Sequence, residues 1–265
     1  MAKKKTEKIE ESKDEYAEIP EEVLNKEDLK ELEEIKGETE KKEFDKDKNK
    51  PSEAWEPKTQ LGREVKSRKI KDIDEILKSG RKILESEISD YLLNLKSDLI
   101  SIGQSKGKFG GGKRRAWRQT QRKTEEGNVP TFSAMAIVGD ENGHVGYGYG
   151  NSMETLPARD KALRKAKLNI IKVTRGCSGF DCDCSELHSV PFKVTGKAGS
   201  VRITLIPAPQ GTGLVVASEL KKVLKLAGIK DVYSKSFGKV RTTFNSIKAC
   251  FDALEKTNSM EGKKE

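Results

Sequence analysis

The strongest chemical signal in this sequence is a dense group of cations in residues 107–123, GKFGGGKRRAWRQTQRK. The stretch holds seven Lys or Arg, four Gly and no acidic residue. These charges repel one another and cannot all be buried, so folding alone does not explain them. Lys and Arg neutralise phosphates and release counterions, and Gly lets a backbone approach a phosphate closely. The pattern predicts binding to RNA through Lys106, Lys108, Lys113, Arg114, Arg115, Arg118, Arg122 and Lys123.

Two aromatic residues of the same stretch, Phe109 and Trp117, could stack on unpaired bases. They could equally anchor the stretch to the protein's own core. The alternative for the whole stretch is a solvated loop without a ligand. We favour a polyanionic partner and expect the stretch to be mobile until it binds, because ordering a flexible chain costs about 1–2 kcal/mol per residue.

A second group of residues has side chains that bind metals. In CSGFDCDCSELH, the spacing C-x4-C-x-C-x3-H joins Cys177, Cys182, Cys184 and His188. Zinc binds thiolate and imidazole ligands in a tetrahedron, and three Cys with one His would complete it. Two interpretations remain open, because the spacing differs from the common C-x2-C pairs. One is a site for a zinc ion, and the other is three reduced thiols in a loop, with His188 entering the next strand.

Evidence for catalysis is weak in this sequence. The glycine-bearing loop of LIPAPQGTGLVV could hold a phosphate through its backbone amides. Its Gly211 and Gly213 lack the spacing of the common nucleotide-binding motifs, so a strand-to-helix turn is favoured. The chain has two His, His144 and His188, and no clear third member of a catalytic group. We predict that the protein is not an enzyme and has no catalytic residue.

Charge is distributed unevenly along the 265 residues, of which 36% are charged and 34% hydrophobic. The first fifty residues hold 13 basic and 18 acidic residues, a net charge of −5, so the rest must carry +14 to reach the total of +9. A basic body with an acidic tail indicates a nucleic-acid partner. No apolar run approaches membrane-spanning length and no secretory signal is seen, so we expect a cytoplasmic protein without a membrane partner, with its four Cys reduced.

The elements that position these residues are read from hydrophobic periodicity. Residues 52–98 are predicted to form short amphipathic helices, with apolar stripes at Ile73, Ile76 and Leu77 and at Ile88, Tyr91, Leu92, Leu95 and Leu99. A β-hairpin follows in residues 131–150, with Asn142-Gly143 as a type I′ turn. Ser152 is then expected to cap a helix that ends near Ile171 and packs closely on the sheet through Ala158, Ala162, Ala166 and Ile170.

The last part of the chain reads as a small α/β layer. A strand is expected around residues 188–195, and a second unit begins near Gly196. Its pattern is a strand in SVRITLI, a loop in PAPQGTG, a helix from Ser218 to Gly228, a strand in DVYSKSFG and a final helix with Phe244, Ile247, Phe251 and Leu254 on one face.

Four segments together resemble the small-subunit ribosomal protein S five family, called S two in eukaryotes. They are FSAMAIVGDENGHVGYGYG, SVPFKVTGKAGSVRITLIPAPQGTGLVV, AGIKDVYSKSFG and TTFNSIKACFDAL, which occur in order within about residues 131–256. Upstream, EAWEPKTQLGREVKSRKIKDIDEI resembles an extension of archaeal and eukaryotic members, and the cysteine cluster is similar to the archaeal form. Residues 104–130 are longer and more basic than the loop of bacterial members, and residues 1–50 resemble nothing in the family.

The resemblance implies an α+β fold. A charged tail, residues 1–51, is expected to be disordered and is followed by the helical extension in residues 52–98. A domain resembling the double-stranded-RNA-binding α/β fold follows in residues 99–195, with a basic glycine-rich loop at 104–130. The last domain, residues 196–265, is a small α/β unit with a left-handed crossover.

The resemblance also implies a function, which is that of a structural protein in the cytoplasmic small ribosomal subunit. Such a protein binds small-subunit rRNA, helps form the mRNA entry channel and supports translational accuracy. Its expected neighbours are mRNA and the S four, S eight and S three families. The alternatives are an RNA chaperone outside the ribosome and, by analogy of fold alone, a phosphate-handling enzyme similar to small-molecule kinases.

Overall fold

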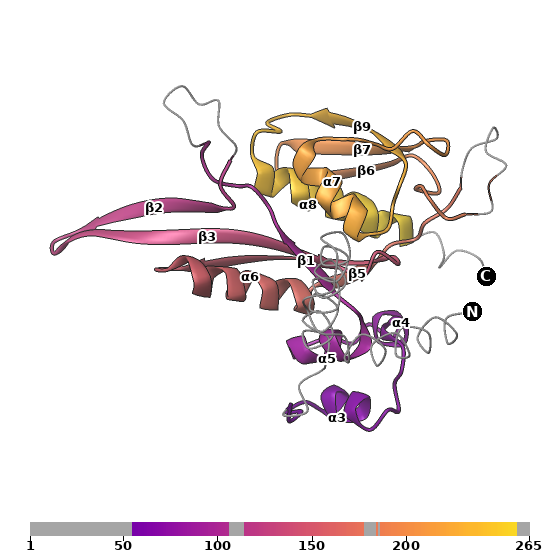
Figure 1. Cartoon of the computed structure of the whole chain (residues 1–265), viewed down its shortest axis with the longest axis horizontal. Helices are drawn as coiled ribbons and strands as arrows, with labels where there is room; N and C mark the ends of the chain where they lie inside the picture. Colours follow the sequence, from indigo (N-terminus) through magenta and orange to yellow (C-terminus); the bar gives the residue numbers. More distant parts are fainter. Residues whose placement is uncertain (1–54, 106–113, 178–183, 185, 259–265) are drawn as a thin grey trace, which may run out of the picture. The chain divides into compact units, whose positions relative to one another are not determined.

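The structure is a computed structural model that describes residues 55–105, 114–177, 184 and 186–258. The described residues lie in one compact unit, Ala54–Glu265. The expected disordered tail, residues 1–51, lies outside them. Two sheets and their helices give the predicted α+β fold (Figure 1). No helix of the described residues is long and apolar enough to cross a membrane.

Three short helices open the described chain. They are α3 (Gln60–Lys66), α4 (Ile73–Lys78) and α5 (Ser86–Leu92). Helix α4 confirms the shorter predicted stripe. The helix predicted from the longer stripe ends at Leu92, so the prediction is wrong for Leu95 and Leu99. Leu93 is already extended, and residues 96–99 form strand β1 (Lys96–Leu99). Strand β1 pairs with β3, so the sheet satisfies backbone groups that a longer helix would have satisfied within itself.

The first sheet is antiparallel, with the order β1-β3-β4-β5 and β2 paired to β3. Its further strands are β2 (Trp117–Thr124), β3 (Gly127–Gly139), β4 (His144–Ser152) and β5 (Ile170–Lys172). Strands β1 and β2 share one edge of β3: β1 pairs with residues 136–139 and β2 with residues 127–134. The predicted hairpin of residues 131–150 is thereby confirmed as β3 and β4.

Helix α6 (Thr155–Leu168) packs closely on β4 through the predicted alanine stripe. A Cβ at Gly148 would lie 2.1 Å from the carbonyl oxygen of Ala162, so only Gly allows this approach. Two details of the prediction are wrong. Ser152 is the last residue of β4, and Glu154 occupies the N-cap without a side-chain hydrogen bond. The helix ends at Leu168, because Ile170 already pairs with β4 as the first residue of β5.

The predicted type I′ turn at Asn142-Gly143 is also wrong. Positive φ occurs at Glu141 and Gly143 but not at Asn142. The connection is wider, because the Asp140 carboxylate accepts the amides of Asn142 and His144 at 2.8 and 3.0 Å. This local side-chain acceptor replaces a two-residue turn.

The second sheet has the order β6-β7-β9-β8. It comprises β6 (Val194–Ala198), β7 (Val201–Pro207), β8 (Leu214–Val215) and β9 (Val232–Phe237), with helices α7 (Ser218–Leu226) and α8 (Thr243–Asn258). Strands β8 and β9 are parallel and are connected through α7. The predicted strands in SVRITLI and DVYSKSFG and both helices are confirmed. The boundary expected between residues 195 and 196 falls inside β6, and the strand expected from residue 188 begins only at Val194.

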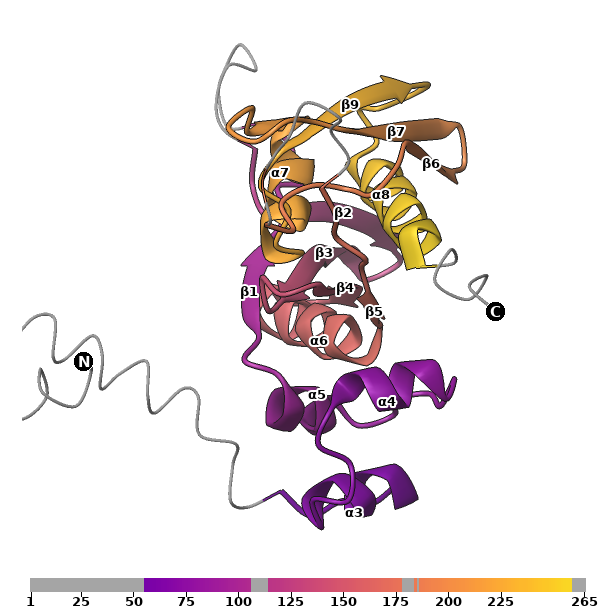
Figure 2. The same ribbon diagram turned by 90° about the vertical axis from the view of Figure 1, so that its right-hand side faces the viewer.

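Both sheets share one hydrophobic core. Helices α7 and α8 lie between the second sheet and the first, and α6 covers the opposite face of the first sheet (Figures 1 and 2). The rings of Tyr147 on β4 and Phe251 on α8 have centroids 4.5 Å apart. Apolar residues of α3 and α4 pack with Val138 and Ala166 in a second cluster. The helical extension is therefore part of the same packed body.

Candidate nucleic-acid interface and cysteine–histidine cluster

The last part of the basic stretch, from Trp117 on, is a strand. Strand β2 pairs with β3 at every residue from Trp117 to Thr124, and the chain reverses at Glu125 and Glu126. The expectation of a loop at residues 104–130 is therefore wrong for β2. The sequence did not reveal the strand, because all eight of its residues are exposed and no apolar alternation marks it. Arg118, Arg122 and Lys123 are thus carried on a hydrogen-bonded ladder.

The described cations of this stretch are positioned by two sets of backbone pairs. Before β2, the amide of Gly103 donates to the Arg115 carbonyl at 2.8 Å, and Ser105 forms an isolated bridge with Arg114. Within β2, residues 118 and 122 lie on one face and residues 117 and 123 on the other, because strand side chains alternate. Lys106, Lys108, Lys113 and Phe109 lie outside the described residues.

Some side chains of the basic stretch line a hollow in the surface. Arg115, Trp117 and Arg118 line it together with polar side chains, and none of the described residues that line it is acidic. Trp117 is 40% exposed, so the interpretation of this ring as a core anchor is wrong and its ring is accessible. Arg114 lines a different hollow at the N-termini of α7 and α8, beside Lys222 and Arg241.

Sequence reasoning missed a second basic surface, on the outer face of the second sheet. The register places Lys197, Arg202 and Phe237 side by side on β6, β7 and β9. Along β9, Tyr233 and Lys235 lie on the same face, and all five side chains are exposed. The alternation of Arg202 with buried neighbours on β7, and of Tyr233 with Val232 on β9, was the available signal. This face combines cations with aromatic rings, as does the hollow at β2.

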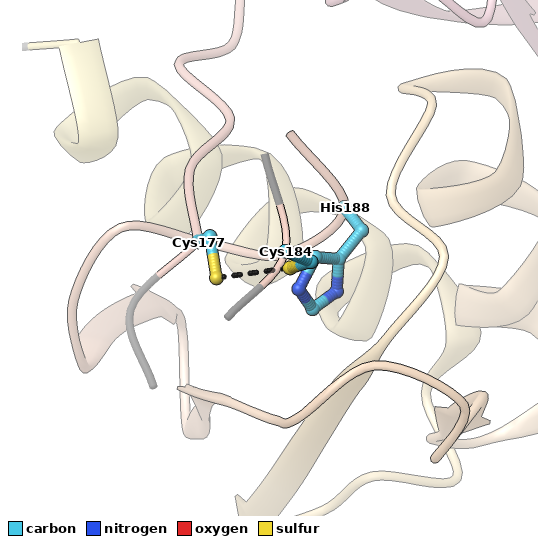
Figure 3. Close-up of side chains that lie close together, drawn as sticks. All are labelled: Cys177, Cys184 and His188. Carbon is cyan, nitrogen blue, oxygen red and sulfur yellow. Dashed lines mark hydrogen bonds between the residues drawn. The ribbon is translucent and has the colours of Figure 1, made fainter. Parts of the chain in front are cut away.

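The predicted metal ligands lie close together where the structure describes them. The donor atoms of Cys177, Cys184 and His188 are all within 4.8 Å of one another, and the two sulfurs are 3.2 Å apart (Figure 3). The two Cys are half-buried and His188 is buried. Cys182 lies outside the described residues. His188 does not enter a strand as expected, since β6 begins six residues later. The alternative of three reduced thiols in a loop stays a hypothesis.

The fourth cysteine is unrelated to this cluster. Cys250 lies on α8 inside the main core, and burial raises the pKa of its thiol to about 12. It is therefore a buried apolar residue and not a reactive thiol.

Each histidine has a carboxylate partner. His188 Nδ1 lies 2.8 Å from Asp231 Oδ2. His144 Nδ1 lies 2.7 Å from Asp140 Oδ2, and its Nε2 lies 2.9 Å from Asp74 Oδ1. Burial alone would lower the pKa of His144, but hydrogen bonds and charge from both carboxylates outweigh it and raise this pKa.

The glycine-bearing loop is not placed at a helix terminus. Residues 208–213 connect β7 to β8, and α7 begins only at Ser218. The strand-to-helix turn is thus interrupted by a short strand, and the loop amides do not form the N-terminus of a helix. This removes the geometric basis for a nucleotide site at Gly211 and Gly213.

Comparison with known proteins agrees with this architecture. The family described as ribosomal protein S5, C-terminal domain, matches residues 196–265, and the family described as ribosomal protein S5, N-terminal domain, matches residues 116–174. The protein named small ribosomal subunit protein uS5 from Nanoarchaeum equitans is 51% identical over 209 residues, which are 78% of this chain and 90% of that protein.

The chain belongs to the ribosomal protein S5 family. A uS5 from Thermofilum pendens is 49% identical over 77% of this chain and 94% of its own length. A uS5 from Methanoregula boonei is 46% identical over 77% of this chain and 93% of its own length. The N-terminal domain match, residues 116–174, and the C-terminal match as far as residue 258 fall within the described α+β body of this S5 family member. The predicted family resemblance is confirmed.

Proposed function

We propose that this S5 family member is a structural component of the small ribosomal subunit and binds small-subunit rRNA. The observation that carries the proposal is the exposed β2 ladder, with Arg118 and Arg122 on one face and Trp117 accessible on the other. Exposed cations can neutralise phosphates, and an aromatic ring can stack on an unpaired base. The S5 family supports a structural role rather than an enzymatic one.

Sedimentation tests this role. Cell extract is separated on a sucrose gradient before and after a high-salt wash, and the protein is followed by immunoblotting. We expect it to stay with the small subunits through the wash. Release into the light fractions would instead support the extra-ribosomal RNA chaperone.

Within the ribosome, we propose that the protein contributes to the mRNA entry channel and to translational accuracy. Its neighbours there would be mRNA and the S four, S eight and S three families, in a cytoplasmic ribosome. The exposed cations and rings on the outer face of the second sheet offer a surface for such contacts. Crosslinking of assembled subunits through Lys197 and Lys235 tests it: adducts to none of these partners would contradict the proposal.

We also propose that the cysteine–histidine cluster holds one zinc ion. A tetrahedral ion with bonds of about 2.0–2.3 Å keeps its ligand atoms roughly 3.5–3.8 Å apart. The donors of Cys177, Cys184 and His188 lie within 4.8 Å of one another, and the two sulfurs, now 3.2 Å apart, would have to separate slightly to bind it. Cys182 remains the fourth ligand proposed from the sequence. Elemental analysis of the purified protein should find about one zinc per chain. Its absence, under conditions in which other zinc proteins retain theirs, would remove the proposal.

A further inference from the structure

Asp231 connects the cysteine–histidine cluster to a distant loop. Its carboxylate is buried at the start of β9, with a side-chain exposure of 5%. One oxygen, Oδ2, lies 2.8 Å from His188 Nδ1, and the other, Oδ1, accepts the amide of Gly213 at 2.7 Å. Both oxygens are therefore committed, one toward the cluster and one toward the loop of residues 208–213.

The contact to His188 determines which ring nitrogen can bind a metal. The negative charge of a carboxylate beside Nδ1 favours the tautomer in which Nδ1 carries the proton. The lone pair then lies on Nε2. Carboxylate–histidine–metal arrangements use this orientation, because it fixes the ring and makes the coordinating nitrogen more basic. Asp231 therefore lies at the ring nitrogen where a metal-coordinating histidine usually has its carboxylate partner.

The surrounding backbone joins the same segments. Gly176 and Ser189 exchange two backbone hydrogen bonds of 2.8 and 2.9 Å, which brings the residue before Cys177 beside the residue after His188. The carbonyl of His188 accepts the amides of Lys230 and Asp231 at 2.8 and 3.1 Å. The donors of the cluster are therefore fixed to the connection that leads into β9.

The loop of residues 208–213 is held at both ends by this network. At its start, the amide of Ala208 donates to Ser189 Oγ at 3.3 Å. At its end, Gly213 donates to Asp231 and has a φ of +72°. A Cβ at Gly211, in the middle of the loop, would meet no atom within 4 Å. Residues adjacent to the cluster thus contribute to the anchoring of the loop, together with the Val232 amide, which donates to the Gly213 carbonyl at 3.2 Å.

We propose that Asp231 is a positioning residue of the metal centre and that it couples metal binding to the order of residues 208–213. This inference rests on the proposed zinc site. Zinc fixes His188, His188 fixes Asp231, and Asp231 fixes the amide of Gly213. Removing the metal leaves His188 less fixed, so the hydrogen bond from the Gly213 amide to Asp231 opens more often.

The substitution Asp231→Asn separates this role from simple packing. The amide keeps an oxygen for Gly213 and nearly the same size, but it presents an NH2 group to His188 Nδ1. That group favours the opposite tautomer, with the proton on Nε2. We expect zinc affinity to fall about 10–100-fold, measured on the full chain by competition with a chromophoric chelator.

Asp252→Asn is the matched control. Its carboxylate also accepts a backbone amide, that of Lys197 at 2.8 Å, but it lies on α8 and is not a member of the cluster. We expect this variant to bind zinc as the wild type does. Circular dichroism is used to check that both variants are folded.

A second measurement needs no variant. Amide exchange at Gly213 is compared in the wild-type protein with bound zinc and after chelation. We expect slower exchange with zinc at Gly213 and no change at Gly127, an exposed turn glycine of the first sheet.

The outcomes distinguish this inference from the zinc proposal. A wild-type chain without zinc removes both. A chain that holds zinc while Asp231→Asn binds it with undiminished affinity, or while Gly213 exchanges equally fast with and without metal, overturns the coupling and leaves the zinc site standing.

Discussion

His144 Nε2 lies 2.9 Å from the Asp74 carboxylate, although the two residues are 70 positions apart in the sequence. The contact joins α4 of the helical extension to the start of β4. Lys172 on β5 reaches the other oxygen of Asp74 at 2.7 Å. One carboxylate thus connects the extension to two strands of the first sheet.

This contact predicts a pH-dependent stability. The pKa of His144 is raised above 6.5, so its contribution is complete below about pH 6.5 and is lost as pH rises through the folded-state pKa. Burial alone would raise the pKa of Asp74, but hydrogen bonds from Lys172 and His144 lower it below 3.8. The Asp74 contribution is therefore present above pH 3.8 and is lost as pH falls through the lowered pKa.

Thermal unfolding at several pH values tests this prediction. We expect the melting temperature of the wild type to decline as pH rises above 6.5, and His144→Gln to flatten that decline. The substitution should cost about 1–3 kcal/mol at pH 6, as for a hydrogen bond to a charged group. An equal pH dependence in the wild type and the variant would show that His144 is not the titrating group.

The cations of β2 should determine how RNA binding depends on salt. Replacing Arg118 or Arg122 by Gln should each reduce the slope of log affinity against log salt by about one at most, if the side chain neutralises one phosphate. This slope is measured by filter binding of the protein to an rRNA fragment at several salt concentrations. The control is Arg81→Gln, whose side chain is paired with Glu64 at 2.9 Å and should leave the slope unchanged. An unaltered slope after both β2 substitutions would exclude this face.

The ring of Trp117 should contribute to binding and little to folding. It is 40% exposed, so Trp117→Ala removes few core contacts. If the ring stacks on a base, the substitution should weaken binding of unpaired RNA by about 1–3 kcal/mol. Fluorescence titration of the wild type and binding assays of the variant measure the effect. A large loss of melting temperature with normal RNA affinity would contradict it.

The turn before β4 should depend on glycine. Gly143 has a φ of +108°, where a side chain is strained, and a Cβ would lie 3.1 Å from the carbonyl oxygen of Val173. Gly143→Val should therefore destabilise the fold by about 1–3 kcal/mol, measured by chemical denaturation. Asn142→Ala, at a neighbouring residue without positive φ, is the control. A stable Gly143→Val protein that fails only in subunit assembly would point to an RNA contact instead.

The elements that could be predicted are those with a buried face. Helix α7 shows a full stripe of Leu220, Val223 and Leu224, all buried, and the alanine stripe of α6 indicated close packing before any sheet was known. Strand β2 could not be found in this way, because its pairing with β3 is made by the backbone and none of its side chains is buried. Leu95 and Leu99 extended a helical pattern by chance beyond the end of α5.

The residues of the candidate site also divide into those that a local sequence pattern revealed and those that it did not. Cys177, Cys184 and His188 are close in sequence, so their spacing was visible. The partners Asp231 and Asp74 come from other parts of the chain. Asp231 is brought to His188 by the backbone hydrogen bonds from the amides of Lys230 and Asp231 to the His188 carbonyl, and Asp74 is brought to His144 and Lys172 by the packing of α4 with β5. No local pattern encodes such pairs.

A density map of the assembled small subunit tests whether the arm formed by the paired strands β2 and β3 binds RNA. We predict that Arg118 and Arg122 lie within hydrogen-bonding distance of rRNA phosphate oxygens, with β2 still paired to β3. A map in which the arm faces only solvent or other proteins would contradict the account.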